Sequence, residues 1–313
     1  MIITQGTMSV FFTTAKTLFN DGWDNAPSHA FEVAMKVTTG SLTGEYGWVG
    51  QFPQMREWIG DRYLKNLNAY DYSIKNLPFE STVKIPRASL EDDQYGLFAP
   101  MFRNMGRMTR LHPDTLVFQL LKNGFTTSCY DGQPFFNANH PSFDVNGNEI
   151  TVSNVQSGAG PAWFLLDTTQ AIKPIIFQER IPYEFQTVNL DTDARVFLSD
   201  EYLYGVRARL NVGFGFWHMA FGSQLPLNAT NYAAARAAMQ VLMGDGGQYL
   251  AVNPNVLVVP PSLEADARML LKATSVTSDA AFDTGSGVVS GGIAAVSNIW
   301  HDSAELIVTP FVA

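Results

Sequence analysis

The side chains most able to do chemistry lie close together between positions 129 and 141. Cys129 is followed by "YDGQPFFNANHP", which contains Asp131 and His140. A thiol, a carboxylate and an imidazole can act as nucleophile, orienting acid and general base, so the spacing raises the possibility of hydrolytic chemistry. The same stretch is also rich in glycine, proline and asparagine, which are typical of tight turns.

An architectural interpretation of this stretch is favoured over a catalytic one. Asp131 and the asparagines can bind nearby backbone groups, the prolines fix φ, and Phe135 and Phe136 can attach the loop to a core. A lone cysteine is more often a small buried apolar side chain than a nucleophile. An enzyme that uses Cys129, Asp131 and His140 is the alternative, and it predicts that Cys129→Ala removes an activity while leaving assembly intact.

No other pattern indicates a catalytic, cofactor or metal site. The five histidines are not spaced for a helical zinc site, and the single cysteine cannot form a ligand pair. There is no Walker loop, no nucleophile elbow, and no glycine fingerprint in a strand-to-helix context. A calcium loop over residues 144–149 fails because its glycine falls between the required ligands. We therefore expect no catalytic residues, no cofactor and no metal ion.

Composition indicates a folded protein made in a reducing compartment. With 313 residues, of which 46% are hydrophobic, the chain can bury a large core. The start of the chain lacks the pattern of a signal peptide, and no run approaches the roughly 18 apolar residues of a membrane-spanning helix. A net charge of −9 argues against a general nucleic-acid binder.

The charge is unevenly distributed along the chain. Residues 56–87 carry six basic and four acidic side chains, whereas residues 221–313 carry three basic and seven acidic ones. Such segments favour charge-complementary contact between copies of the chain. Two solvated faces without a partner are an equally good explanation of the charge alone.

The first half of the chain predicts a helix, a long β excursion and then a longer helix. The helix is expected over residues 9–20, and the antiparallel β excursion runs from residue 44 to 86. Its middle, "MREWIGDRYLKNL", gathers charges and aromatic rings where an exposed tip would lie, which suggests a surface that meets another subunit. Residues 91–124 then show helical spacing, with a core stripe at Phe98, Met101, Phe102, Met105 and Met108.

Local signals place further boundaries. Pro113 either kinks the long helix or opens a second one at residues 111–112. Asn146-Gly147 between extended flanks predicts a hairpin. The sequence from residue 163 to 221 predicts β-strands, including the stretch "RVFLSDEYLYGVRARLNVGFGFWHMAF". Thr230 is the expected cap of a helix that stops at residues 244–247; then follow a buried strand "VLVVP", a helix from Ser262 and a final strand within "AELIVTPFV".

Six separated blocks resemble, in order, the major head subunit of Mu-like tailed phages. They are "YGWVGQFPQMREWIGDR", "EDDQYGLFAPMFRNMGR", "LLKNGFTTSCYDGQPFF", "LLDTTQAIKPIIFQER", "GFGFWHMA" and "GDGGQYL". The similarity covers nearly the whole chain and is weakest at "VTSDAAFDTGSGVVSGG".

The resemblance implies an α+β fold of the Hong Kong 97-like coat type. It implies an N-terminal arm (1–43), an extended β loop (44–88), a peripheral domain (89–224) and an axial domain (225–313). Within the peripheral domain it implies a spine helix (91–124), a loop (125–159) and long β strands (160–224).

The same resemblance implies a capsid function without catalysis. The chain is expected to self-assemble into pentamers and hexamers of an icosahedral shell around double-stranded DNA. Expected partners are a separate scaffolding protein, a head-maturation protease, a portal and a possible decoration protein, with no membrane. Expected location is the virion capsid, after assembly as a procapsid in the host cytoplasm.

Two sets of contact residues follow from these expectations. The loop tip is expected to touch a neighbouring subunit through Arg56, Trp58, Asp61, Arg62 and Tyr63. An axial-domain loop near the capsomer centre is expected at Gly244, Asp245, Gly246 and Gly247. A bacterial nanocompartment shell, another phage structural protein and, remotely, a hydrolase are the alternatives.

Overall fold

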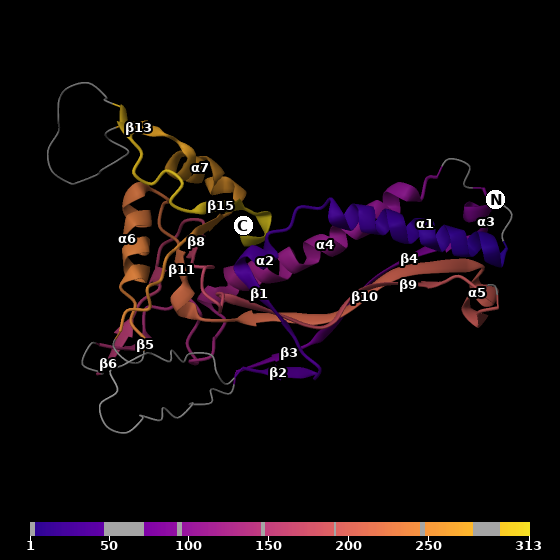
Figure 1. Cartoon of the computed structure of the whole chain (residues 1–313), viewed down its shortest axis with the longest axis horizontal. Coiled ribbons are helices and arrows are strands. Elements are labelled where there is room, and N and C mark those ends of the chain that lie inside the picture. Colours follow the sequence, from indigo (N-terminus) through magenta and orange to yellow (C-terminus); the bar gives the residue numbers. More distant parts are fainter. Residues whose placement is uncertain are drawn as a thin grey trace.

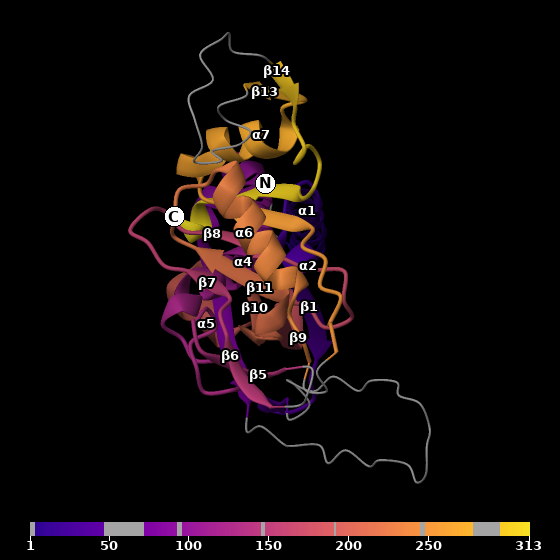
Figure 2. The same cartoon turned by 90° about the vertical axis from the view of Figure 1, so that its left-hand side faces the viewer.

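The chain builds a long β-sheet and a compact one within an elongated molecule (Figure 1). The computed structural model describes residues 4–46, 72–92, 96–144, 148–190, 192–244, 248–277 and 295–313. The long sheet and two long helices form one end of the molecule, and the compact sheet lies at the other end beside α6 and α7 (Figures 1 and 2).

The long sheet has four strands in the order β1, β9, β10, β4. Their bounds are Ala34–Thr38 for β1, Leu77–Pro86 for β4, Ile175–Val188 for β9 and Glu201–Phe214 for β10. Strand β10 is antiparallel to both neighbours, and its register with β4 runs from Glu201 opposite Pro86 to Leu210 opposite Leu77. Buried side chains alternate along the first half of β10, so one face of this sheet is packed and the other is solvated.

Helices α1 (Gln5–Asp24) and α4 (Ala99–Lys122) cover the packed face of the long sheet. Tyr204 of β10 meets Phe11 and Phe102 edge to face, with ring centroids 5.6 and 5.3 Å apart. Helix α1 starts four residues earlier than expected because Thr4 forms a reciprocal capping box with Thr7.

Helix α4 is a single 24-residue helix even though Pro113 lies inside it. The alternative of a second helix opening at residues 111–112 is therefore wrong. The spine helix also starts later than predicted, since Arg87–Glu91 forms a separate short helix, α3. Gly96 has a φ of +64°, which is a left-handed conformation. A continuous right-handed helix therefore cannot run from α3 into α4.

The compact sheet has five strands in the order β15, β12, β8, β11, β7. They span Val155–Gln156 (β7), Trp163–Leu166 (β8), Ala220–Ser223 (β11), Val256–Val259 (β12) and Glu305–Val308 (β15). Every residue of β8, β11 and β12 is buried, which explains why these strands are continuous apolar runs in the sequence. Helices α6 (Ala229–Gln240) and α7 (Glu264–Lys272) join the same core through apolar stripes that include Met239 and Leu271.

Short elements complete the described structure. Three two-stranded ladders are formed by β2 (Thr43–Glu45) with β3 (Ser73–Lys75), β5 (His140–Phe143) with β6 (Glu149–Val152), and β13 (Ser275–Thr277) with β14 (Ala295–Ser297). The β5–β6 pair confirms the predicted hairpin. Short helices are α2 (Ala30–Val33), α5 (Ala194–Ser199) and four 3-10 turns at Asn123–Phe125, Trp217–Met219, Pro261–Leu263 and Pro310–Val312.

Two sequence-based expectations need correction. Residues 194–199 form α5 and not a strand, because Asp193 caps them and a short apolar run does not distinguish strand from helix. Helix α6 is capped by Asn228, whose side chain accepts from the N–H of Asn231, and not by Thr230. The compact sheet takes β8 and β11 from before the predicted 224/225 boundary and β12 and β15 from after it.

Candidate functional site

The base of the predicted extended loop is firmly attached to the long sheet. Within the predicted loop (44–88), the N–H of Tyr46 donates to the carbonyl of Tyr72 at 2.8 Å. The Tyr46 hydroxyl donates to Gln178, whose amide donates to the carbonyl of Ile74, and Gln178 is fully buried. Burial also raises the pKa of Tyr46 to about 12, so this hydroxyl remains a donor at neutral pH.

The predicted contact residues themselves lie outside the described part of the chain. This holds for Arg56, Trp58, Asp61, Arg62 and Tyr63. What the structure does place is the anchor. The N–H of Phe214 in β10 donates to the hydroxyl of Tyr72 at 2.6 Å, so Tyr46 and Tyr72 are both tied to the long sheet.

The second predicted surface, the axial loop, follows α6. Of its four residues only Gly244 is described, and its N–H donates to the carbonyl of Gln248 at 2.9 Å. Met243 and Tyr249 close the loop as an antiparallel bridge. The hydroxyl of Ser142 in the β5–β6 hairpin donates to the Met243 carbonyl, so the hairpin contacts the chain where this loop begins. Asp245, Gly246 and Gly247 fall outside the described ranges.

The structure brings Cys129, Asp131 and His140 into one buried cluster. The Cys129 thiol donates to Asp131 Oδ1 at 3.0 Å, and His140 Nδ1 faces Asp131 Oδ2 at 2.6 Å. His140 Nε2 faces the carbonyl oxygen of Phe135 at 3.2 Å. Each ring nitrogen of His140 therefore faces an oxygen atom within hydrogen-bond distance, so the imidazole is held on both sides. The two side chains are 0% and 2% exposed.

This geometry does not suit a thiol nucleophile. The carboxylate of Asp131 lies between the thiol and the imidazole, and the thiol of Cys129 donates to it. Burial raises the pKa of this thiol, and the neighbouring Asp131 raises it further. A catalytic cysteine needs the opposite, a lowered pKa and a base in contact with sulfur. The arrangement favours the architectural interpretation of the loop.

The same three side chains are also a possible metal ligand set, which the sequence analysis did not anticipate. One sulfur, one oxygen and one nitrogen atom lie within 4.8 Å of one another. Spacing rules missed the set because the loop, and not a helix or a cysteine pair, brings the atoms together. The hydrogen bonds among Cys129, Asp131 and His140 satisfy these polar groups without an ion.

Two histidines sandwich Trp217 next to this cluster. The His140 ring stacks on Trp217 at 4.1 Å, and Trp217 stacks on His218 at 3.6 Å. Burial, aided by the charge of His140, lowers the pKa of His218 to about 3. His218 is therefore neutral at every pH at which the subunit is folded and assembled under ordinary conditions.

We expect acid to destabilise the unassembled subunit through His218. Between its ordinary pKa of about 6.5 and the folded value of about 3, only the unfolded chain binds the proton. The free energy of unfolding should fall with decreasing pH in that window, by at most about 1.4 kcal/mol per pH unit. Urea unfolding at pH 7, 6 and 5 measures this slope. His218→Phe should flatten it, whereas His301→Phe, at a partly exposed side chain, should not; equal slopes in all three proteins would contradict the assignment.

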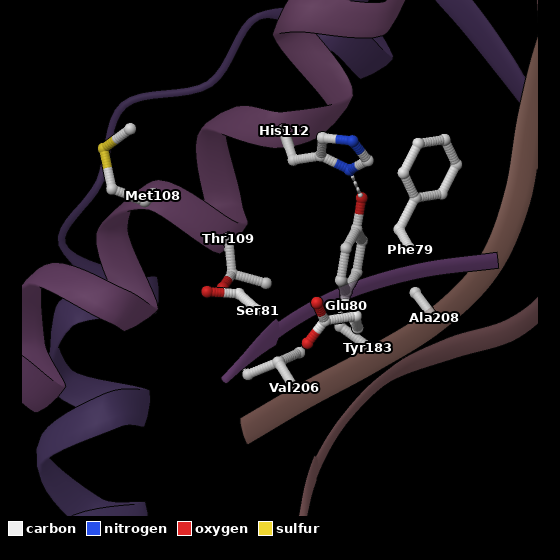
Figure 3. A pocket seen from close by; sticks show the side chains of 9 residues that line it. All are labelled: Phe79, Glu80, Ser81, Met108, Thr109, His112, Tyr183, Val206 and Ala208. Carbon is white, nitrogen blue, oxygen red and sulfur yellow. Dashed lines mark hydrogen bonds between the residues drawn. The ribbon is translucent and has the colours of Figure 1, made fainter. Parts of the chain in front are cut away.

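A groove of about 160 Å³ lies between α4 and the strands of the long sheet (Figure 3). His112 points into it and shares a hydrogen bond of 2.6 Å with the hydroxyl of Tyr183. Met108 lines the rim and is 59% exposed, so it does not belong to the buried stripe in which the sequence placed it. Burial lowers the pKa of His112, which keeps the groove uncharged at this point. No local sequence pattern predicts the groove, because its lining comes from four separate elements.

Two solved structures with a similar fold are coat proteins of a phage. A chain titled "Procapsid of bacteriophage JBD30 computed in I4 symmetry" matches with a TM-score of 0.80 and 39% identity, over 99% of this chain and 100% of that one. A chain of the JBD30 capsid "decorated with minor capsid protein trimers" matches with a TM-score of 0.72 and 28% identity, over 92% of each. The predicted α+β fold is confirmed: this is a coat subunit of the Hong Kong 97-like type.

Sequence relatives narrow the class to one family. The major capsid protein of Escherichia phage Mu is 40% identical over 277 residues, which are 87% of this chain and 91% of the relative. Residues 8–312 match the family described as Mu-like prophage major head subunit gpT, and the chain belongs to that family. None of the described helices is long and apolar enough to cross a membrane.

Proposed function

We propose that this chain is the major capsid protein of a Mu-like phage head. Copies of it assemble into pentamers and hexamers of an icosahedral shell that encloses double-stranded DNA. The observation that carries this proposal is the agreement with the JBD30 procapsid chain over the full length of both proteins. Electron microscopy of the purified chain, alone and with neighbouring gene products, tests it. Closed shells or five- and six-fold rings are expected, and monodisperse monomers under both conditions would contradict the proposal.

The proposed mechanism is repetition of modest contacts. Heterologous interfaces close into rings, and the extended loop (44–88) of one copy lies across its neighbour. The attachment of Tyr46 and Tyr72 to β10 and Gln178 supports this role, because it allows force on the loop to reach the sheet. The loop at Gly244–Gly247 is proposed to lie near the capsomer centre.

The proposed domain assignment follows the pattern of the family. Residues 1–43 act as the arm, 89–224 as the peripheral domain and 225–313 as the axial domain. The compact sheet contains strands from both sides of residue 224, so the two proposed domains share this sheet.

Other partners and the site of assembly are part of the same proposal. A separate scaffolding protein, a maturation protease and a portal take part in assembly in the host cytoplasm. A decoration protein is a further partner, by analogy with the decorated JBD30 capsid. The chain itself acts without catalysis, a proposal that the carboxylate between Cys129 and His140 supports.

Removing the two arginines of the loop tip should impair assembly without unfolding the subunit. We expect Arg56→Ala/Arg62→Ala to lower the yield of closed shells at least about tenfold, because a loss of about 1.4 kcal/mol weakens one contact tenfold and the loss is repeated at every contact of the shell. Sedimentation and electron microscopy measure the yield, and circular dichroism checks the fold. Arg56→Lys/Arg62→Lys is the matched control, since it keeps both charges; wild-type yield from the alanine variant would refute the contact.

A further inference from the structure

The two most exposed large apolar side chains of the described residues are neighbours on α5. Phe197 is 82% exposed and Leu198 is 83% exposed. Scattered single apolar side chains are normal on a protein surface, but two adjacent bulky ones on one short helix call for an explanation. We call Phe197 and Leu198 the α5 patch.

The backbone beneath the α5 patch is fixed. The Asp193 carboxylate caps the helix by accepting from the N–H of Arg195, and Val196 anchors it with 2% exposure. At the other end Asp200 adopts a φ of +50°, and its carbonyl accepts from the N–H of Arg87, the first residue of α3. A six-residue helix has little stability of its own, so these anchors hold the patch outward.

The position and surroundings of the α5 patch indicate what covers it. Figure 1 places α5 at the far end of the long axis, beyond the ends of β9 and β10 and away from the compact sheet. Arg195 and Asp200 border the patch, and both are exposed. Neither side chain forms an ion pair with another of the residues that the structure describes. A border with both signs of charge complements a second copy of itself better than it complements a uniformly charged surface.

We propose that the α5 patch is a contact between copies of this chain, in which Phe197 and Leu198 of one copy cover the same residues of another. The inference rests on the proposed shell function and names one surface that the function uses. Contact between identical patches brings Arg195 of one copy close to Asp200 of the next, so an apolar centre is closed by a polar rim.

The test compares shell yields of variants that keep the fold. Phe197→Ser/Leu198→Ser should unfold at nearly the wild-type temperature, because the side chains are exposed in the subunit, but should lower shell yield at least tenfold. Phe197→Met/Leu198→Met keeps the apolar surface and should restore the yield. Ile299→Ser, at another exposed apolar residue with 61% exposure, controls for general loss of surface hydrophobicity.

A cross-link tests the contact directly. Leu198→Cys in a Cys129→Ala background places one thiol on the patch, and a short bis-maleimide should convert subunits of assembled particles into covalent dimers. Wild-type yield from the serine variant, or the absence of dimers, overturns the inference. The same holds if the serine variant forms normal shells that only fail to bind a decoration protein.

Failure of the proposed function gives a different result. If the wild-type chain forms no shells or rings with its neighbouring gene products, that function fails first. Cross-linking of the concentrated Cys129→Ala/Leu198→Cys subunit then still tests the α5 contact. Covalent dimers support the contact, and monomers overturn it.

Discussion

Gly106→Val should lower the free energy of unfolding of the subunit by about 3 kcal/mol or more, one of the largest effects of any single substitution in the chain. Gly106 of α4 and Gly22 of α1 lie where the two helices cross. A Cβ at Gly106 would overlap the carbonyl oxygen of Phe19 and come within 2.9 Å of the N–H nitrogen of Trp23. These are backbone atoms, so they cannot rotate away, and the helices must separate.

The control is Gly6→Ala in α1, the helix that packs on α4. A Cβ at Gly6 has only the Thr4 side-chain oxygen nearby, at 3.8 Å, and alanine has the higher helix propensity. Urea unfolding of both variants measures the difference. Unchanged stability of Gly106→Val would mean that α1 does not pack on α4 in solution as it does in the structure.

His140→Ala should destabilise the subunit by about 3–5 kcal/mol, because it removes the buried partner of Oδ2 of the Asp131 carboxylate. Asp131 also accepts from Cys129 and from the N–H of Gln133, but both of these donors bind Oδ1 and leave Oδ2 without a partner. Cys129→Ala should cost only about 1 kcal/mol, the usual contribution of one hydrogen bond, and should leave shell formation intact.

A double-mutant cycle separates the pair from its surroundings. Asp131→Ala, His140→Ala and the double variant are compared by urea unfolding at pH 7, and the double variant should cost clearly less than the two single losses together. Strictly additive losses would show that the two side chains do not interact.

The pair also predicts a dependence on pH. Burial alone would raise the pKa of Asp131, but hydrogen bonds from His140 and Cys129 and the charge of His140 outweigh it and hold the pKa below its ordinary value. A lowered folded pKa gives a contribution that is present above the unfolded pKa of about 4 and is lost as pH falls through the folded pKa. The gap between wild type and His140→Ala should therefore narrow below about pH 4.

Much of the fold was predictable because local chemistry decides it. Asn146-Gly147 specified the β5–β6 hairpin, and buried runs such as "VLVV" specified central strands of the compact sheet. Helix α5 was missed because "RVFL" suits a strand equally well, and its cap at Asp193 is only recognisable once the neighbouring strands are placed. Pro113 was ambiguous, since tertiary packing and not sequence decides whether a helix tolerates an internal proline.

The candidate sites were less predictable for a related reason. Cys129 and His140 were recognised as neighbours, but the loop fold determines that Asp131 stands between them. The bond between His112 and Tyr183 joins residues 71 positions apart, a separation at which no local pattern reports contact. The α5 patch could only be recognised after burial was known, because an exposed Phe-Leu pair has the same letters as a buried one.

The pairing of β4 with β10 has a mechanical consequence under the proposed shell function. Strand β4 forms the last part of the proposed extended loop (44–88), and all ten of its residues pair with β10. Antiparallel hydrogen bonds run perpendicular to the strands, so tension on the loop shears the whole row at once and does not open it one bond at a time. In the proposed shell, a pull from a neighbouring copy would therefore be shared along the length of the sheet, and the loop would act as a tether that resists expansion of the particle.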